Sequence, residues 1–562
     1  MRRLAAASVL VLLTVLAAPG RAAPDLTIPA DVQQAARAQI TAPALAAPIR
    51  ILSSDAFEGR GPATRGDTLA RLYLATELQA LGYAPGGVNG GWEQPVDLIG
   101  VQTHAPATWS FQTKSGDTNL VWRDDYIAAS GVQEAQALVR DAELVFVGYG
   151  IQAPEYHWDD FKRAKLAGKI LVMMNNDPDW DPKLFAGNRR LYYGRWMYKY
   201  ESAARQGAAG AIIIHTTPSA GYPWQVVQSS WSGEQFGLPA EGEPQIQLKA
   251  WATESAMRRL LQAAGFDLDK LIAAAKSRNF HPVALGIRTS ISTQNDVHRV
   301  RSANVLGLLP GSDPKLRSQV VIYSAHHDHF GIGAPDATGD RIYHGAIDNA
   351  SGCAQVLSIA KAYAALPQRP RRSVLIMFVA GEEQGLIGSL YYARHPTVPL
   401  ANIAVDVNYD GGNKWGHARD VISIGLGKST TDRYVAAAAA LQGRRVDPDA
   451  FPDRGYFYRA DQFSFAKYGV PGVYLHGSVD FIGHPAGWGR EQREQWELTR
   501  YHQPGDRLES DWNFDGMIDD ATLGFWAGWL MAQADDMPVW NPGDEFEAAR
   551  KRTLAEPPAA HP

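Results

Sequence analysis

The chain of 562 residues contains a single cysteine, Cys353, so it cannot form a disulfide bond within itself. Its stability must therefore come from packing, and a hydrophobic content of 45% supplies enough apolar side chains for two cores. Cys353 follows Ser351 and Gly352 in an alanine-rich helical pattern. That context predicts a small packed core residue rather than a reactive nucleophile.

A strong excess of charge of one sign is also lacking. Lysine and arginine number 54 against 59 aspartates and glutamates, which gives a net charge of −5. A surface of mixed sign with so weak an acidic excess does not suggest nucleic acid as a partner.

Long apolar runs are lacking as well, so no membrane partner is expected. At the start of the chain, Arg2 and Arg3 precede an apolar stretch at residues 4–16, and small residues follow up to Ala23. This pattern predicts a secretory signal peptide at residues 1–22, and hence export to the periplasm or the medium. The stretch is short for a membrane anchor, and no cysteine follows it that could carry a lipid.

The pattern of the remaining chain changes along its length and divides it into four parts. In the second part, at residues 106–295, short strand-like runs predict a β-rich insert, with a strand at residues 170–174 and a helix at residues 196–206. In the third part, at residues 296–545, strands alternate with helices, which predicts an α/β fold with a mostly parallel mixed sheet flanked by helices. The parts are the first segment of the main domain (30–105), the insert (106–295), the catalytic segment (296–545) and a disordered tail (546–562).

Within the catalytic segment the expected elements follow one another closely. Strands are predicted at residues 320–324, 374–379 and 403–409, and helices at residues 354–366 and 386–392. Polar and charged residues follow each of these strands directly. In an open α/β sheet, ligands bind at the carboxyl ends of the strands.

Five candidate metal ligands recur in one order along this segment, each at the end of an apolar run or on a loop. A single His-x-Asp is common by chance, but imidazoles and carboxylates in this succession favour a dinuclear zinc site of a hydrolase. The five residues are His326, Asp348, Glu383, Asp410 and His502.

His326 and Asp328 follow the strand at residues 320–324. Alternation along an extended chain places both side chains on one face. We therefore expect the carboxylate of Asp328 to accept a hydrogen bond from the imidazole of His326 and to fix its tautomer. The neighbouring His327 and His329 are weaker ligand candidates.

Asp348 lies in a glycine-bounded loop at residues 345–352 that opens a helix. Its two carboxylate oxygens could bridge two metal ions. The alternative role is that of a helix N-cap, which Asn349 or Ser351 could fill equally well.

Glu382 and Glu383 follow the strand at residues 374–379. Two adjacent carboxylates at a strand end are unfavourable unless cations neutralise them. One of the pair would then bind zinc, while its neighbour takes a proton from a water molecule on the metal.

The last two ligand candidates follow a strand and a Pro-Gly loop. Asp410 comes after the strand at residues 403–409, in which Asp406 is a weaker candidate. His502 precedes a Pro-Gly turn, and Asp506 is a plausible partner that orients its ring. The alternative for His502 is an ordinary surface histidine.

Together these motifs resemble the M28 family of zinc peptidases. The match is specific because several separate sequence motifs agree with those of the family. Within the insert, residues 144–150 and 203–210 resemble the protease-associated (PA) domain that many members contain. The resemblance implies a zinc exopeptidase-like fold with an inserted PA domain. The matching segments are residues 52–61, 324–329, 345–352, 381–389, 408–410 and 501–506.

The resemblance also implies roles for individual residues. One zinc ion would be held by His326, Asp348 and Asp410, and the second by Asp348, Glu383 and His502. A hydroxide bridging the two metals would be the nucleophile, Glu382 the general base, and peptides with a free N-terminus the substrates of an exported aminopeptidase. Two departures are His327, where a tyrosine is common, and Gln462, where a histidine is common.

Two other functions remain possible on this scaffold. A glutaminyl-cyclase-like acyltransferase keeps much of the same ligand order, and a related branch of the family is a binding scaffold without catalysis. The inserted domain favours the peptidase over the cyclase, and the intact ligand set with Glu382 argues against the inactive scaffold. We expect the insert to shape access to the site rather than to carry chemistry, and none of its residues is a plausible zinc ligand.

Overall fold

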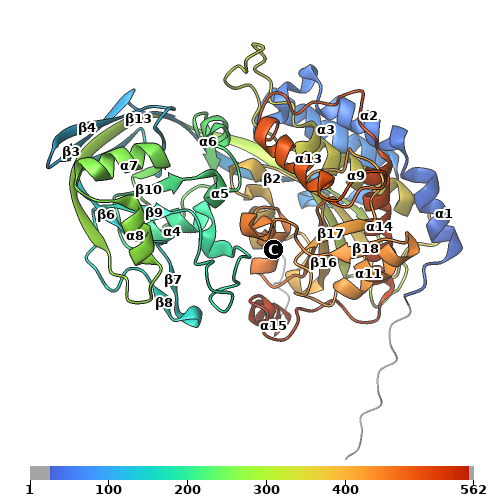
Figure 1. Cartoon of the computed structure of the whole chain (residues 1–562). Helices are drawn as coiled ribbons and strands as arrows, with labels where there is room; N and C mark the ends of the chain where they lie inside the picture. The colour runs from blue at the N-terminus through green and yellow to red at the C-terminus, as the bar shows by residue number, and fades with distance from the viewer. Residues whose placement is uncertain (1–25, 556–562) are drawn as a thin grey trace, which may run out of the picture.

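The computed structural model describes residues 26–555, so the predicted signal peptide lies outside the described residues. Figure 1 shows two lobes. The insert, in green and cyan, forms one lobe, and the main domain forms the other. Strands β2 (Glu93–His104) and β13 (Val283–Leu309) connect them as an antiparallel ribbon, paired from Glu93 and Val305 to His104 and Gln294.

The main domain is built on a mixed sheet with a parallel centre, as predicted. Strands β15, β14, β16 and β19 run parallel to one another, and β13 and β17 flank them in the antiparallel sense. A short β18 pairs with β17 at the edge. The strands are β14 (Val320–His326), β15 (Ser373–Val379), β16 (Ile403–Asn408), β17 (Asp420–Ile424), β18 (Arg445–Asp447) and β19 (Gly472–Leu475).

Alternation along the central strands divides their side chains between two apolar layers. In β14, Val321 and Tyr323 pack into a large cluster with the helices of one face, whereas Val320 and Ile322 join a smaller cluster on the other. Burial on both faces explains why these strands are continuous apolar runs. The first face is covered by α1 (Ala30–Gln39), α2 (Ala42–Leu52), α3 (Arg65–Ala80), α9 (Gly352–Ala364), α11 (Asp432–Leu441) and α14 (Asp515–Gln533), and the second by α10 (Ile387–Arg394) and α12 (Gln462–Lys467).

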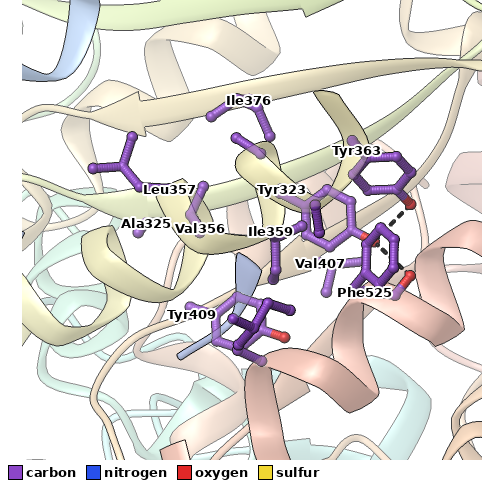
Figure 2. Packing of buried hydrophobic residues seen from close by; sticks show 14 of the residues in the cluster. Tyr323, Ala325, Val356, Leu357, Ile359, Tyr363, Ile376, Val407, Tyr409 and Phe525 are labelled. Atoms are coloured by element: carbon purple, nitrogen blue, oxygen red, sulfur yellow. Dashed lines mark hydrogen bonds between the residues drawn. The ribbon is translucent and has the colours of Figure 1, made fainter. Parts of the chain in front are cut away.

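Close packing of α14 on the sheet depends on two glycines. The hydroxyl of Tyr323 lies 3.0 Å from that of Tyr363 and donates to the carbonyl oxygen of Gly524 at 3.0 Å, at the centre of the cluster in Figure 2. A Cβ atom at Gly528 would lie 1.8 Å from the Tyr323 hydroxyl, and one at Gly524 would lie 1.7 Å from that of Tyr409. Only glycine fits at these two positions.

The insert has its own apolar core between strands and helices. Strands β6, β9, β10 and β12 run parallel in succession, and β5 and the β3–β4 hairpin complete the sheet with the far half of β13. The predicted strand at residues 170–174 is β9, and the predicted helix at residues 196–206 is α4. The elements are β3 (Thr108–Thr113), β4 (Gly116–Val121), β5 (Tyr126–Ser130), β6 (Gln136–Phe146), β9 (Ile170–Met174), β10 (Gly210–His215), β12 (Leu248–Thr253), α4 (Trp196–Arg205), α6 (Trp224–Trp231), α7 (Glu254–Ala263) and α8 (Leu268–Ala275).

The prediction of a disordered tail is wrong for residues 547–555, which form α15 (Glu547–Ala555). Arg550 in this helix is buried and donates to the carbonyl oxygens of Leu400 and Ile403. The helix is held by these tertiary contacts, which its composition does not reveal. Across residues 26–555, no helix has both the length and the apolarity to span a membrane.

Replacing Gly528 by alanine should destabilise the main domain. Alanine gains about 1 kcal/mol of helix propensity, whereas overpacking a core costs roughly 1–3 kcal/mol or more. The second effect should win, because the Tyr323 hydroxyl is fixed by two hydrogen bonds. We expect a lower midpoint of thermal unfolding by calorimetry, with Gly233→Ala, where a Cβ atom meets open space, as the control. An unchanged midpoint would show that α14 does not pack this closely.

Candidate metal centre

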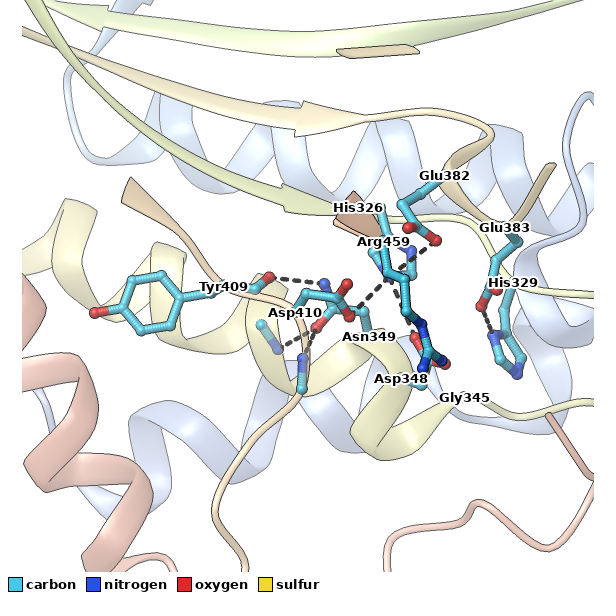
Figure 3. A network of polar contacts seen from close by, with 12 residues as sticks. His326, His329, Gly345, Asp348, Asn349, Glu382, Glu383, Tyr409, Asp410 and Arg459 are labelled. Carbon is cyan, nitrogen blue, oxygen red and sulfur yellow. Dashed lines mark hydrogen bonds and ion pairs between the residues drawn. The ribbon is translucent and has the colours of Figure 1, made fainter. Parts of the chain in front are cut away.

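Three neighbouring strands end at the same edge of the central sheet and deliver the site. β14 ends at His326, the turn after β15 contains Glu382 and Glu383, and Asp410 follows β16. Figure 3 shows these side chains converging on Asp348, which lies on the turn before α9. The sequence-based placement of these residues at carboxyl ends of strands is therefore confirmed.

The five predicted ligands form two groups that share Asp348. The Nε2 atom of His326 lies 3.2 Å from one oxygen of Asp348 and 3.4 Å from Asp410. The Nε2 atom of His502 lies 3.3 Å from the other oxygen of Asp348 and 3.1 Å from Glu383. The two oxygens of one carboxylate therefore face different imidazoles, which is the arrangement that a bridging ligand requires.

The donor atoms of these groups suit a divalent cation. The Nε2 atom of His502 is buried and makes no hydrogen bond to any residue that the structure describes, so it is free to coordinate. Burial lowers the pKa of His502, but the carboxylates of Glu383 and Asp348 raise it to about 9 overall. So many buried carboxylates need positive charge beside them, and zinc accepts both imidazole nitrogen and carboxylate oxygen.

The two adjacent glutamates lie in different environments. Burial and Asp348 oppose ionisation of Glu383, yet His502 and His329 lower its pKa to about 2. Burial raises the pKa of Glu382 well above its usual value, and its carboxylate lies 3.8 Å from the Nε2 atom of His326. The structure thus separates one ionised carboxylate among the ligands from a neighbour that can hold a proton.

The position of Asp328 differs from the prediction. Its carboxylate lies 3.7 Å from the Nδ1 atom of His326, which is too far for a hydrogen bond. That Nδ1 atom lies 3.3 Å from the main-chain oxygen of Asp328 instead. The carboxylate accepts hydrogen bonds from the backbone N–H groups of Glu382 and Glu383, at 3.1 and 3.4 Å. Asp328 therefore fixes the turn that presents both glutamates.

Asp506 was expected to orient His502, but it holds the loop of Asp348. Its carboxylate accepts hydrogen bonds from the backbone N–H groups of Ile347 and Asp348, at 3.1 and 3.0 Å. Arg60 lies in the matching segment 52–61 but had no predicted role; it donates to the carbonyl oxygens of His327, His344 and Gly345 at 2.8 to 2.9 Å.

His502 obtains its partner from the insert. Its Nδ1 atom lies 2.9 Å from the hydroxyl of Ser230, near the end of α6. The insert therefore contributes no residue to the ligand groups, but it supplies an outer hydrogen-bond partner that the sequence did not indicate. A serine inside an ordinary helical pattern carries no sequence signal for this role, because the contact depends on how the two lobes meet.

The other histidines and the two departures have structural contacts. His329 was a weak ligand candidate, and its Nδ1 atom lies 2.5 Å from Glu383. His327 lies 2.9 Å from the carboxylate of Asp67. Gln462 accepts from Asn408 and donates to a backbone oxygen, so it stabilises the wall behind the site.

Two further expectations concern residues near the ligands. Cys353 is buried with its sulfur 3.2 Å from the main-chain oxygen of His326, as expected of a packed residue. The carboxylate of Asp406 accepts a hydrogen bond from Ser324 at 2.7 Å and does not join the ligand groups.

The fold and the cluster define an α/β protein with a candidate metal centre at the carboxyl edge of its parallel strands. Residues 304–525 match the model of Peptidase family M28. The matched residues make up about two fifths of the chain and contain all five candidate ligands.

This chain matches only part of the length of individual relatives. A Leptosphaeria maculans protein named "Probable zinc metalloprotease" is 38% identical over 111 residues, 20% of this chain and 24% of that protein. Leupeptin-inactivating enzyme 1 of Streptomyces exfoliatus is 26% identical over 265 residues, 46% of this chain and 54% of the enzyme. The chain therefore matches about a quarter and about half of the length of these two relatives.

A solved structure extends the likeness to most of the fold. The aminopeptidase from Aneurinibacillus sp. strain AM-1 superimposes with a TM-score of 0.52 at 19% sequence identity, covering 92% of this chain and 97% of that one. At this identity the likeness concerns the fold.

Removal of the Ser230 hydroxyl should weaken metal binding. Outer partners of metal-bound histidines typically contribute ten- to a hundredfold in affinity, so Ser230→Ala should lower zinc affinity by about tenfold. Competition with a chromophoric chelator measures this change. The control is Ser232→Ala, because Ser232 lies two residues further along the chain and donates to the main-chain oxygen of Gln228 rather than contacting the centre. Equal affinities of the two variants would contradict a role for Ser230.

Proposed function

We propose that this protein is an exported dinuclear zinc aminopeptidase that removes N-terminal residues from peptides. The observation that carries the proposal is the pair of ligand groups sharing Asp348, with His326 and Asp410 on one side and His502 and Glu383 on the other. The match of residues 304–525 to the model of Peptidase family M28 supports the peptidase class.

The five side chains would hold two zinc ions. Bound zinc supplies Lewis-acid polarisation of a substrate carbonyl and makes an attacking water more acidic. His326 and Asp410 would complete one coordination sphere, and His502 and Glu383 the other. Asp328, Asp506 and Ser230 hold these ligands through the hydrogen bonds described above.

Glu382 would act as the general base. Its carboxylate is buried beside the ligand groups, and the raised pKa allows it to hold a proton after taking it from water. The same proton can then pass to the amine that leaves when the peptide bond breaks. Asp328 positions this group by holding the backbone N–H of Glu382.

The substrates would be short or flexible peptides, because the site opens into a cavity between the lobes. Trp196 and Tyr222 of the insert line this cavity together with Glu382, Tyr501 and His502 of the main domain. The solved structure with a similar fold is named an aminopeptidase. The predicted signal peptide supports the export part of the proposal.

Metal removal should abolish activity reversibly. We expect two zinc ions per chain by elemental mass spectrometry, loss of leucyl-anilide hydrolysis on chelation, and recovery on adding zinc. Two ions are expected because the ligand atoms form two groups rather than one. One tightly bound ion with full activity would contradict the dinuclear site and favour the glutaminyl-cyclase-like alternative.

Exchange of the two glutamates for glutamine should produce different defects. Glu382→Gln should leave zinc content nearly unchanged and lower kcat by roughly a hundredfold or more, the scale expected when a positioned general base is lost. Glu383→Gln should deplete zinc, because it removes an ionised ligand. Elemental analysis and steady-state kinetics on both proteins measure this, and exchanged behaviours would reverse the assignment.

A further inference from the structure

Arg195, at the start of α4 in the insert, is a buried arginine with no counterion among residues 26–555. Its side chain is 5% exposed, and its Nη1 atom is buried without a hydrogen-bond partner. Burial and then the nearby Arg459 lower the pKa of Arg195 to about 9, and Arg190 acts in the same direction. No carboxylate is among the groups that act on it most strongly.

Arg459 of the main domain lies close to the ligand groups and also has a buried nitrogen without a hydrogen-bond partner. Its side chain lines a cavity together with Asp348 and Glu382, and Figure 3 draws these residues in one view. One nitrogen donates to the Tyr501 hydroxyl at 2.8 Å, but the Nη1 atom is buried without a partner. Its guanidinium carbon also lies 5.0 Å from the centre of the Tyr456 ring, which fixes the position of the group further.

Both arginines line the cavity that reaches Glu382, Glu383 and His502. Two buried guanidinium groups near each other repel, and a buried unpaired charge is costly. The carboxylates in this cavity do not relieve the cost if they are neutralised by metal ions. Each arginine thus combines a side chain that lines the cavity with one buried donor that has no partner among the described residues.

We propose that Arg195 and Arg459 together form a subsite for a carboxylate of the substrate. A carboxylate accepts parallel hydrogen bonds from guanidinium groups and is the anion that peptides carry. This inference rests on the proposed peptidase function and names its substrate class, which is peptides with a carboxylate next to the scissile bond. The carboxylate is either an acidic N-terminal side chain or the free C-terminus of a short peptide.

Paired substrates distinguish the two sources. Glutamyl and glutaminyl p-nitroanilides differ in the side-chain carboxylate alone, whereas leucylglycine and leucylglycinamide differ in the C-terminal carboxylate alone. For one pair, we expect the carboxylate-bearing member to have a kcat/KM higher by roughly tenfold or more, the scale of charge-assisted hydrogen bonds. The pair that shows the preference identifies the source.

Variants test whether Arg195 generates the preference. In Arg195→Gln the preference should fall toward equality, mainly through KM, while zinc content stays the same. Arg195→Lys keeps the charge but loses the planar fork, so it should retain part of the preference, and it serves if Arg195→Gln does not fold. Arg140→Gln, at an exposed arginine on β6 of the same lobe, is the matched control and should keep the full preference.

A binding measurement separates this inference from the proposed function. Calorimetry of the same four compounds with zinc-loaded Glu382→Gln protein, with and without Arg195→Gln, reports the subsite in the absence of turnover. Stronger binding of one carboxylate-bearing compound, lost with Arg195→Gln, would support the subsite even if no peptide were hydrolysed. Chelator-sensitive cleavage of leucyl-anilide, with no carboxylate preference in kinetics or binding, would overturn the subsite and leave the peptidase intact.

Discussion

The structure depends on one constraint, which is that the carboxylate of Asp348 must present its two oxygens to two buried imidazoles. His326 and His502 lie 3.2 and 3.3 Å from those oxygens, although they are far apart in the sequence. Asp506 holds the loop of Asp348 through backbone N–H groups, which are neutral donors that a carboxylate attracts. No further positive charge is therefore needed behind this loop. The negative charge of the cluster is then left for cations in front of it.

The same constraint links the two lobes of the molecule. β13 runs without interruption from the sheet of the insert into the sheet of the main domain, which sets how the lobes face each other. At the far side of the cavity, α6 places Ser230 against the ring of His502. The insert is thus part of the wall that orients a ligand, and its position and the geometry of the centre are coupled through one hydrogen bond.

Sequence patterns predicted those parts of the structure that depend on local order. Buried strands such as β9 and β14 are continuous apolar runs, and the candidate ligand His326 at the end of β14 follows from the rule for parallel sheets. Contacts between distant segments could not be predicted in this way. Asp506 was paired with its neighbour in sequence, His502, when its partners are backbone groups of Ile347 and Asp348, and the helix around Arg550 depends on contacts with residues near Leu400.

Charge is separated within the cavity in a way that gives the lobes different tasks. All the carboxylates of the ligand groups come from the main domain, and they surround imidazoles that stabilise their ionised forms. Guanidinium donors without a partner come from both lobes, through Arg195 and Arg459, and both side chains line the same cavity. A carboxylate held by both guanidinium groups would contact the insert and the main domain at once. Substrate charge would then be recognised where the lobes meet, while the chemistry stays on the strands of the main domain.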